Sequence, residues 1–322
     1  MAGDNIKLPS IDDVRFAAER IRNYIHRTPV LTSISINKIV GSDVYFKCEN
    51  FQKVGAFKFR GATNAVFSLL DEEIRKGVAT HSSGNHAQAI ALTAKMRGTK
   101  AFIVMPSNST KVKVEAVKGY GAEVIFCGPT LQARESTLDE VVSKTGATFI
   151  HPYNNFNVIS GQGTTALELL EDVKNLDYVI TPVGGGGLLS GSLTTISAIS
   201  PSTRVIAAEP EGADDAYRSI IENRIVPSVN PKTVCDGLFT SLGELTFEII
   251  KKNIYKIITV SDDSVIKAMR LIWERMKIIV EPSSAITLGI LLENKIDLKT
   301  KRIGIILSGG NVDLENLPWM RK

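Results

Sequence analysis

The sequence has few cysteines, no long apolar run and no block of charge of one sign. Only three cysteines occur, Cys48, Cys127 and Cys235. An odd, widely spaced set of this kind excludes a disulfide framework and a C-x-x-C metal site. No run reaches the roughly 18 apolar residues that a membrane span needs, and the first residues carry no apolar signal region. We therefore expect a cytoplasmic protein with reduced thiols and no membrane partner.

The charge balance also excludes a strongly polyanionic partner. Lys and Arg total 38, Asp and Glu total 34, and the net charge of +4 is not gathered into patches. This balance gives no electrostatic support for binding a nucleic acid or a membrane surface. With 322 residues, of which 43% are hydrophobic and 22% charged, the chain suits an ordinary globular protein of two lobes or one large α/β unit.

The chain does contain a regular alternation of strand and helix patterns. Short β-rich runs occur at 44–46, 78–80, 102–105, 124–126, 178–180, 205–207 and 303–307. Amphipathic stretches lie at 86–97, 110–118, 130–144, 161–173 and 262–277. Ser10 and Asp13 resemble a capping box at the start of an earlier helix. Strands separated by helices predict parallel βαβ units, so we expect an α/β fold.

The segment 76–150 contains three compact strand–helix units and ends near His151 and Pro152. We expect it to form a small, mobile domain inserted into a large domain made of residues 1–75 and 151–322. Ligands of open α/β sheets bind beyond the carboxyl ends of the strands. Each chemical motif of this chain follows such an end or lies close to one.

Lys58 is the most informative residue, because it stands between two aromatic residues in the stretch 55–61. An ammonium group held among apolar side chains loses hydration, so its neutral amine becomes easier to reach. A neutral lysine amine can form a Schiff base with an aldehyde and can shuttle protons. Taken alone, such a triplet is more often a surface lysine with a buried stem. The other motifs decide between the two interpretations.

Four consecutive glycines, Gly184, Gly185, Gly186 and Gly187, precede Leu188 between a predicted strand and a helical stretch. Their unobstructed N–H groups and the positive N-terminus of the next helix would suit a phosphate. The motif is not a Walker A loop, because no Gly-Lys-Ser/Thr follows, and it is not the usual dinucleotide fingerprint. The alternative is a flexible turn.

A second polar motif follows the predicted strand at 78–80. It consists of Ser82, Ser83, Gly84, Asn85 and His86. Two hydroxyls, a glycine and an amide at a helix N-terminus can hold a substrate carboxylate or orient a ring hydroxyl. The alternative is a simple N-cap turn. No second histidine stands at metal-ligand spacing from His86, so we expect a structural imidazole and no zinc.

Ser308 closes the last predicted strand, where a hydroxyl can bond a ring nitrogen. A reactive lysine, a phosphate site, a carboxylate-binding turn and a strand-end serine together fit pyridoxal 5′-phosphate. This cofactor offers an aldehyde, a phosphate and a pyridine nitrogen, and it acts as an electron sink for carbanions at Cα.

The stretches 56–61, 82–87, 184–187, 281–283 and 308–311 together resemble a known family. They are similar to the fold-type II pyridoxal-phosphate enzymes of the serine racemase and threonine dehydratase group, and the resemblance covers nearly the whole chain. It implies two open, twisted, mostly parallel sheets flanked by helices, in a large and a small domain. It also implies a homodimer and a small-molecule amino-acid substrate.

The resemblance implies a role for each motif. Lys58 would hold the cofactor as a Schiff base, residues 184–188 would bind its phosphate, Asn85 its ring hydroxyl, and Ser308 its pyridine nitrogen. Tyr153 replaces an asparagine near the cofactor. A neutral serine beside the pyridine nitrogen should leave that nitrogen unprotonated, which weakens the electron sink. Prompt β-elimination or reprotonation is then favoured over transamination.

Racemisation and dehydration of the substrate are both open to such a site. Racemisation needs a proton-transfer group on each face of Cα, and Lys58 and Ser83 are the candidates. Dehydration needs one base and protonation of the departing hydroxyl. We expect an enzyme that interconverts L-serine and D-serine and also converts serine to pyruvate and ammonia. The alternatives are a dehydratase of L-threonine or 3-hydroxyaspartate with little racemase activity, and a non-catalytic binding protein, against which intact Lys58, Ser83 and Ser308 argue.

Two regulatory sites are also suggested. The acidic stretch 209–215 supplies hard oxygens for Mg²⁺, Ca²⁺ or Mn²⁺, and the family pattern uses Glu209, the Ala213 carbonyl and Asp215. An ATP site between subunits would use the residues at the matching positions, which are Ser33, Ile34, Lys53, Gln88, Tyr120, Lys277 and Asn311. Ile34 and Val54 stand where the mammalian pattern has a hydroxyl residue, so ATP would lose two hydrogen-bond partners.

Overall fold

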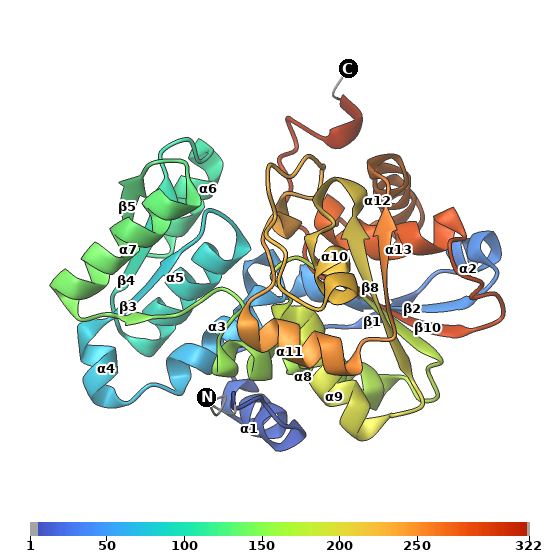
Figure 1. Ribbon diagram of the computed structural model, residues 1–322, viewed down its shortest axis with the longest axis horizontal. Coiled ribbons are helices and arrows are strands. Elements are labelled where there is room, and N and C mark those ends of the chain that lie inside the picture. The colour runs from blue at the N-terminus through green and yellow to red at the C-terminus, as the bar shows by residue number, and fades with distance from the viewer. Residues whose placement is uncertain (1–5, 321–322) are drawn as a thin grey trace.

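The computed structural model describes residues 6–320, which form two β-sheets with helices on both faces (Figure 1). The small sheet lies on the left of Figure 1 and the large sheet on the right. The predicted α/β fold with two mostly parallel sheets is therefore confirmed. Within residues 6–320, none of the helices is long and apolar enough to cross a membrane.

The large sheet has the strand order β1-β2-β10-β7-β8-β9 within the described residues. Its strands are β1 (Val30–Thr32), β2 (Asp43–Cys48), β7 (Tyr178–Pro182), β8 (Arg204–Pro210), β9 (Lys256–Val260) and β10 (Arg302–Leu307). The pair β1–β2 is antiparallel and the other pairs are parallel. In β10, Ile305 pairs with Phe46 on one side and Ile180 on the other. A strand enclosed in this way must be apolar at nearly every position, which explains the Ile-Gly-Ile-Ile-Leu run.

Helices cover both faces of the large sheet. On one face lie α2 (Ile34–Val40), α12 (Asp262–Met276) and α13 (Pro282–Glu293), packed against alternate strand residues such as Ile180 and Ile305. On the other face lie α8 (Phe156–Asp172), α9 (Gly187–Ile199), α10 (Asp215–Glu222) and α11 (Glu244–Asn253), packed against Val179 and Val205. The alternation follows from the period of two of a β-strand.

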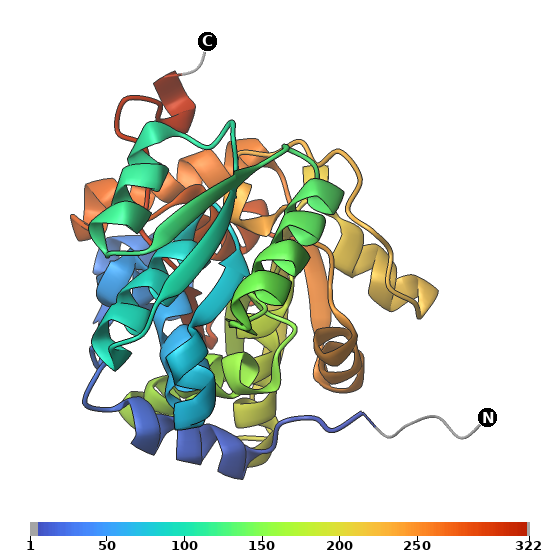
Figure 2. The same ribbon diagram turned by 90° about the vertical axis from the view of Figure 1, so that its left-hand side faces the viewer.

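The small sheet has the order β5-β4-β3-β6 with all pairs parallel. Its strands are β3 (Val78–His81), β4 (Ala101–Pro106), β5 (Glu123–Cys127) and β6 (Thr148–Phe149). Ile103 and Met105 face α5 (Asn85–Arg97) and α6 (Lys111–Gly119), whereas Phe102 and Val104 face α7 (Leu131–Thr145). Figure 2 views this sheet from its outer side, with helices on both faces. All four strands lie within the segment 76–150, whose domain boundaries and mobility stay predictions.

Helix α3 (Lys58–Phe67) joins the two sheets and begins at the lysine singled out above. Phe59 and Val66 pack into the core of the small sheet. On the side of the large sheet, a Cβ atom on Gly161 of α8 would lie 2.7 Å from the Cα of Gly61. Only glycine permits such close backbone packing. The position of Lys58 is therefore fixed by cores on both sides.

Most predicted elements are observed at their predicted places. Ser10 forms the capping box with Asp13 at the start of α1 (Ile11–Ile21). Helices α5, α6, α7 and α12 agree with the predicted ranges to within about one residue at each end. Helix α8 starts at Phe156, earlier than the predicted 161, because glycines that weaken a helix pattern are used here for close packing. Strands β1, β6 and β9, which had no prediction, all lie at sheet edges.

Candidate active site

Backbone contacts join residues 56–58, the Lys58 segment, to residues 308–309, the Ser308 turn, beyond the end of β10. Ala56 forms an isolated antiparallel bridge with Gly309. The Phe57 N–H donates to the Ser308 carbonyl at 3.0 Å. Lys58 is the first residue of α3 and Ser308 is the first residue after β10. The backbone therefore holds these two predicted site residues in a fixed relation.

Lys58 lies in surroundings that favour its neutral amine. Its Nζ donates to the Pro152 carbonyl at 2.9 Å and lies 5.2 Å from the centre of the Phe57 ring. Burial lowers the pKa of Lys58 to about 8, against the opposing charge of Glu281. The amine form is thus accessible near physiological pH, as the flanking aromatic residues predicted.

The loop 82–84 joins β3 to α5 and carries the predicted carboxylate-binding turn. Two backbone donors fix it: the Ser82 N–H bonds the Val104 carbonyl at 3.1 Å, and the Gly84 N–H bonds Ser82 Oγ at 3.2 Å. Ser83 is half-buried, and its hydroxyl bonds no other group among residues 6–320. This hydroxyl is therefore available to a substrate.

Asn85, the first residue of α5, reaches across to the large sheet. Its Nδ2 donates to the two carboxylate oxygens of Glu281 at 3.1 and 3.3 Å, and its Oδ1 accepts from Asn311 Nδ2 at 2.8 Å. One N–H of the Asn85 amide remains for a ligand. Burial, with the neighbouring charge of Asp236, raises the pKa of Glu281 to about 8. In the sequence, Glu281 stands out only as part of the 281–283 motif, and no sequence signal indicates that its carboxyl contacts Asn85.

The tetraglycine loop lies buried between β7 and the N-terminus of α9. Gly186 has a φ of +86°, a conformation that glycine adopts without steric cost. The Gly185 carbonyl accepts from Thr246 Oγ1 at 2.9 Å, whereas the N–H groups of Gly184, Gly185 and Gly186 donate to no other group among residues 6–320. Leu188 is buried in the core behind the loop. An anion at this helix N-terminus is favoured by the helix dipole.

Three histidines lie close to the site. His86 Nε2 bonds the Ile150 carbonyl at 3.2 Å in the interior, so its imidazole ties α5 to the end of β6, as expected for a structural residue. His81 was not singled out in the sequence, and His151 was named there only as the end of the segment 76–150. Burial lowers the pKa of each to about 4, so both are neutral at physiological pH. His151 Nδ1 accepts the backbone N–H of Tyr153 at 3.2 Å.

Pyridoxal 5′-phosphate fits this arrangement of groups. The glycine loop offers backbone donors at a helix N-terminus, where side chains at several positions would collide with their neighbours. Lys58 offers an amine of lowered pKa for the aldehyde, and Asn85 offers an amide N–H for the ring hydroxyl. Ser308 is almost fully buried and offers a neutral hydroxyl for the ring nitrogen.

In the acidic stretch predicted to bind a divalent cation, the Glu209 oxygens have hydrogen-bond partners and the Asp215 oxygens have none among residues 6–320. Both Glu209 oxygens already accept backbone N–H groups, from Ala216 at 2.7 Å and Tyr217 at 2.8 Å, at the start of α10. Both oxygens of Asp215 are buried without a hydrogen-bond partner among residues 6–320. Burial raises the pKa of Asp215 to about 6, and the nearby Ser228 hydroxyl opposes this shift. Ala213 is buried beside them. Residues 6–320 contain no cluster of three His, Cys, Asp or Glu side chains arranged around a metal site.

The residues predicted for a nucleotide lie on several elements. Ser33 and Ile34 line a surface cavity of about 600 Å³, and Ile34 is 76% exposed. The other residues that line this cavity are Thr32, Ser35, Lys38 and Arg275. The five remaining predicted residues, Lys53, Gln88, Tyr120, Lys277 and Asn311, are not part of its lining. Within one chain, the structure does not bring the seven residues together.

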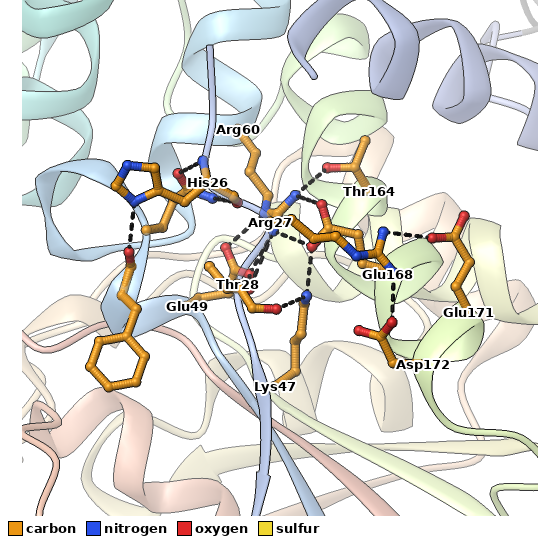
Figure 3. A network of polar contacts seen from close by, with 12 residues as sticks. His26, Arg27, Thr28, Lys47, Glu49, Arg60, Thr164, Glu168, Glu171 and Asp172 are labelled. Atoms are coloured by element: carbon orange, nitrogen blue, oxygen red, sulfur yellow. Dashed lines mark hydrogen bonds and ion pairs between the residues drawn. The ribbon is translucent and has the colours of Figure 1, made fainter. Parts of the chain in front are cut away.

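A buried cluster of four charges lies behind Lys58 and had no sequence prediction (Figure 3). Arg60, two residues after Lys58, bonds Glu49 through Nε and Nη2 at 2.7 and 2.9 Å and Glu168 through Nη1 and Nη2 at 2.8 and 2.7 Å. Lys47 pairs with the same Glu168 carboxylate. Two cations and two anions make the cluster neutral, and it ties β2, α3 and α8 together behind the site.

Comparison with known proteins shows the family to which the chain belongs. Residues 21–309 match the family model described as "Pyridoxal-phosphate dependent enzyme". The chain is 51% identical over 312 residues to the serine racemase of Dictyostelium discoideum, with 96% of each chain covered. It is 49% identical over 312 residues to the beta-hydroxyaspartate dehydratase of Paracoccus denitrificans (strain Pd 1222), with 97% of this chain and 99% of that protein covered.

Solved structures give the same result. Maize serine racemase superposes with a TM-score of 0.95 at 47% identity, covering 98% of this chain and 97% of that one. A threonine deaminase from T.th. superposes with a TM-score of 0.90 at 41% identity, covering 95% of this chain and 99% of that one. The chain therefore belongs to the family of pyridoxal-phosphate dependent enzymes, and its fold is of type II.

Proposed function

We propose that this protein is a serine racemase that uses pyridoxal 5′-phosphate to interconvert L-serine and D-serine. It also dehydrates serine, and the product hydrolyses to pyruvate and ammonia. The observation that carries the proposal is the presence of two proton-transfer groups, the Lys58 amine with its lowered pKa and the uncommitted Ser83 hydroxyl. The 51% identity to a serine racemase over nearly the full length supports it.

Each group of the site has a proposed task. The bound cofactor withdraws electrons from Cα and so acidifies its proton. Lys58 binds the cofactor and moves a proton on one face of Cα, and Ser83 moves a proton on the other face. The backbone N–H groups at the start of α5, together with Ser82, hold the substrate carboxylate. His86 contributes there through its backbone, because its imidazole bonds Ile150.

The two reactions differ in what happens after Cα loses its proton. Racemisation returns a proton to the opposite face, so both Lys58 and Ser83 are needed. Dehydration loses the β-hydroxyl with that proton as water, so one base is sufficient. Ser308 would offer a neutral hydroxyl to the ring nitrogen of the cofactor, which would weaken electron withdrawal from Cα, and both outcomes are compatible with that.

Replacing Ser83 by alanine is expected to separate the two activities. Formation of D-serine should fall by about 10²-fold or more, the contribution of one positioned proton-transfer group, while pyruvate formation from L-serine persists. Chiral chromatography and a coupled pyruvate assay on the same samples measure both. Ser136→Ala, an exposed serine on α7, is the control and should change neither. Retained racemisation in Ser83→Ala would remove the proposed role of Ser83.

The second candidate is a dehydratase of 3-hydroxyaspartate with little racemase activity, because the chain is 49% identical to a beta-hydroxyaspartate dehydratase. L-Threonine is a further candidate substrate. A panel of L-serine, L-threonine and 3-hydroxyaspartate, assayed for the D-isomer and the keto acid together, discriminates the candidates. If L-serine yields no D-serine at any enzyme concentration, the racemase is refuted and the dehydratase becomes the proposed function.

We further propose that Mg²⁺, or Ca²⁺ or Mn²⁺ in its place, binds at Asp215 with Glu209 and the Ala213 carbonyl. The support is the buried, unpartnered carboxylate of Asp215, which a cation would satisfy. Chelation of wild-type protein should then lower the melting temperature and the activity, and added Mg²⁺ should restore both. Asp215→Asn should lose this response and Asp214→Asn, whose carboxylate pairs with Arg218, should keep it. Indifference of wild-type protein to chelation would refute the site.

The remaining proposals concern assembly and regulation. We propose a homodimer in the cytoplasm, because the resemblance implies this assembly and the three cysteines are free and buried. ATP is proposed as an activator bound between subunits, with Ser33 and Ile34 on the cavity described above. Residues 76–150 are proposed as the mobile small domain that closes over the substrate.

A further inference from the structure

The side chain of Tyr153 lies directly against the glycine loop. A Cβ atom built on Gly185 would have three atoms of the Tyr153 ring as its nearest neighbours, at 2.3 to 2.5 Å. A Cβ atom on Gly187 would lie 3.0 Å from the Cβ of Tyr153. The tyrosine therefore fills the space that side chains at these two positions would take. The Tyr153 ring and the side-chain-free backbone of Gly185 and Gly187 are thus complementary in shape.

The other two glycines of the loop are surrounded differently. A Cβ atom on Gly184 would meet the Leu238 Cα at 2.9 Å, and Gly186 has a φ of +86°. Tyr153 is not among the nearest neighbours of either position. Its closest contacts are thus with Gly185 and Gly187, so this pair can be tested separately from Gly184 and Gly186.

Tyr153 is itself held in place on several sides. Its ring packs edge to face against His151, with centres 4.6 Å apart at an angle of 88°, and its N–H donates to the same imidazole at 3.2 Å. Burial raises the pKa of the phenol to about 12, against the opposing effect of the nearby Thr240 side chain, so the group is neutral. The ring therefore presents a fixed, uncharged face to the loop.

A loop of four glycines needs such a support. Glycine loses more conformational freedom on ordering than any other residue, so an unsupported loop would bind phosphate weakly. We infer that Tyr153 preorganises the glycine loop and so sets the affinity of this protein for the phosphate group of its cofactor. This inference rests on the proposed function and makes Tyr153 a positioning residue, acting through the backbone of the loop.

The first test is cofactor affinity in the apoprotein. Tyr153→Ala should raise the Kd for pyridoxal 5′-phosphate by about tenfold and change the Kd for pyridoxal, which lacks the phosphate, very little. Tyr153→Phe keeps the ring and should retain most of the wild-type affinity. Equilibrium dialysis gives both constants, and thermal melting of each apoprotein reports folding. Equal weakening for both ligands would overturn the inference.

The second test uses the steric match between ring and loop. Gly185→Ala should weaken phosphate binding strongly in the wild type, because the new methyl group collides with the Tyr153 ring. In the Tyr153→Ala background the ring atoms are absent, so the same change should cost much less. Gly184→Ala is the matched control, because its methyl group would collide with Leu238 and should be equally harmful in both backgrounds.

These results are distinguishable from a failure of the proposed function. A protein that binds no pyridoxal 5′-phosphate at all would refute the proposed function itself. If the wild type binds the cofactor tightly, two results would refute only the role of Tyr153. One is an unchanged Kd in Tyr153→Ala, and the other is an equal loss of affinity from Gly185→Ala in both backgrounds.

Discussion

Replacing Lys58 by alanine is expected to abolish the formation of both D-serine and pyruvate and to end covalent attachment of the cofactor. Lys58 is the lysine whose pKa burial lowers, to about 8, and it stands at the start of α3 beside the Ser308 turn. It is proposed both to bind the cofactor and to move the Cα proton. Loss of the proton-transfer role alone should cost about 10²- to 10⁴-fold in rate.

The attachment can be measured independently of turnover. Borohydride treatment followed by peptide mass spectrometry should place the mass of the reduced cofactor on the peptide that contains Lys58, and on no peptide of the variant. Lys144→Ala, on the exposed side of α7, is the control and should keep both label and activity. Normal activity of Lys58→Ala, or a label on another lysine, would contradict the assignment.

The lowered pKa of Lys58 also predicts how the apoprotein takes up its cofactor. Attack on the aldehyde requires the neutral amine, which is the minor form below the pKa and the major form above it. The rate of covalent attachment should therefore rise with pH and level off above about pH 8. Glu281 opposes this shift, and neutral His86 and His151 add no charge nearby. A rate that still rises near the ordinary lysine value of 10.5 would show that Lys58 is solvated.

The part of the site that could be predicted from the sequence consists of local motifs. A run of four glycines, a lysine between two aromatics and a serine after an apolar strand each have a chemical meaning within a few residues. The parallel fold then places them together, because strand ends of one sheet share an edge. The family resemblance, confirmed by the comparisons, added the assignment of each motif to one part of the cofactor.

The contacts that could not be predicted join residues far apart in the chain. Glu281 is 196 positions from Asn85, and Glu168 is 108 positions from Arg60. No local period or spacing signals such a pair, since each charged residue alone looks like part of a solvated surface. The short edge strands β1 and β6 were missed for a similar reason, because pairing on one side only leaves little apolar pattern.

The largest effect on stability is expected for Arg60→Met. The change leaves Glu49, Glu168 and Lys47 in the interior, so the cluster goes from neutral to a net charge of −1 with a carboxylate that has lost its partner (Figure 3). Removing one member of a buried ion pair costs about 3–5 kcal/mol, because the remaining charge is desolvated without compensation. The midpoint and slope of urea unfolding at neutral pH together give the free energy of unfolding.

Arg27 provides a matched control in the same part of the molecule. It also forms two ion pairs, with Glu171 and Asp172, but its side chain is 53% exposed. Exposed pairs contribute about 0–1 kcal/mol, so Arg27→Met should shift the midpoint only slightly. Equal losses for Arg60→Met and Arg27→Met would mean that burial of the cluster has no energetic consequence.

A second substitution separates lost charge balance from lost packing. In Arg60→Met with Glu49→Gln, Lys47 and Glu168 still balance each other, and the interior is again neutral. The double variant should therefore be less destabilised than the sum of the two single variants, since neighbouring changes in one charge network are not additive. If the two losses simply add, the packing of the Arg60 side chain matters and the charge balance does not.

Because α3 begins at Lys58, the same variants should also bind pyridoxal 5′-phosphate less tightly, and the loss of affinity should grow with the net charge left in the cluster.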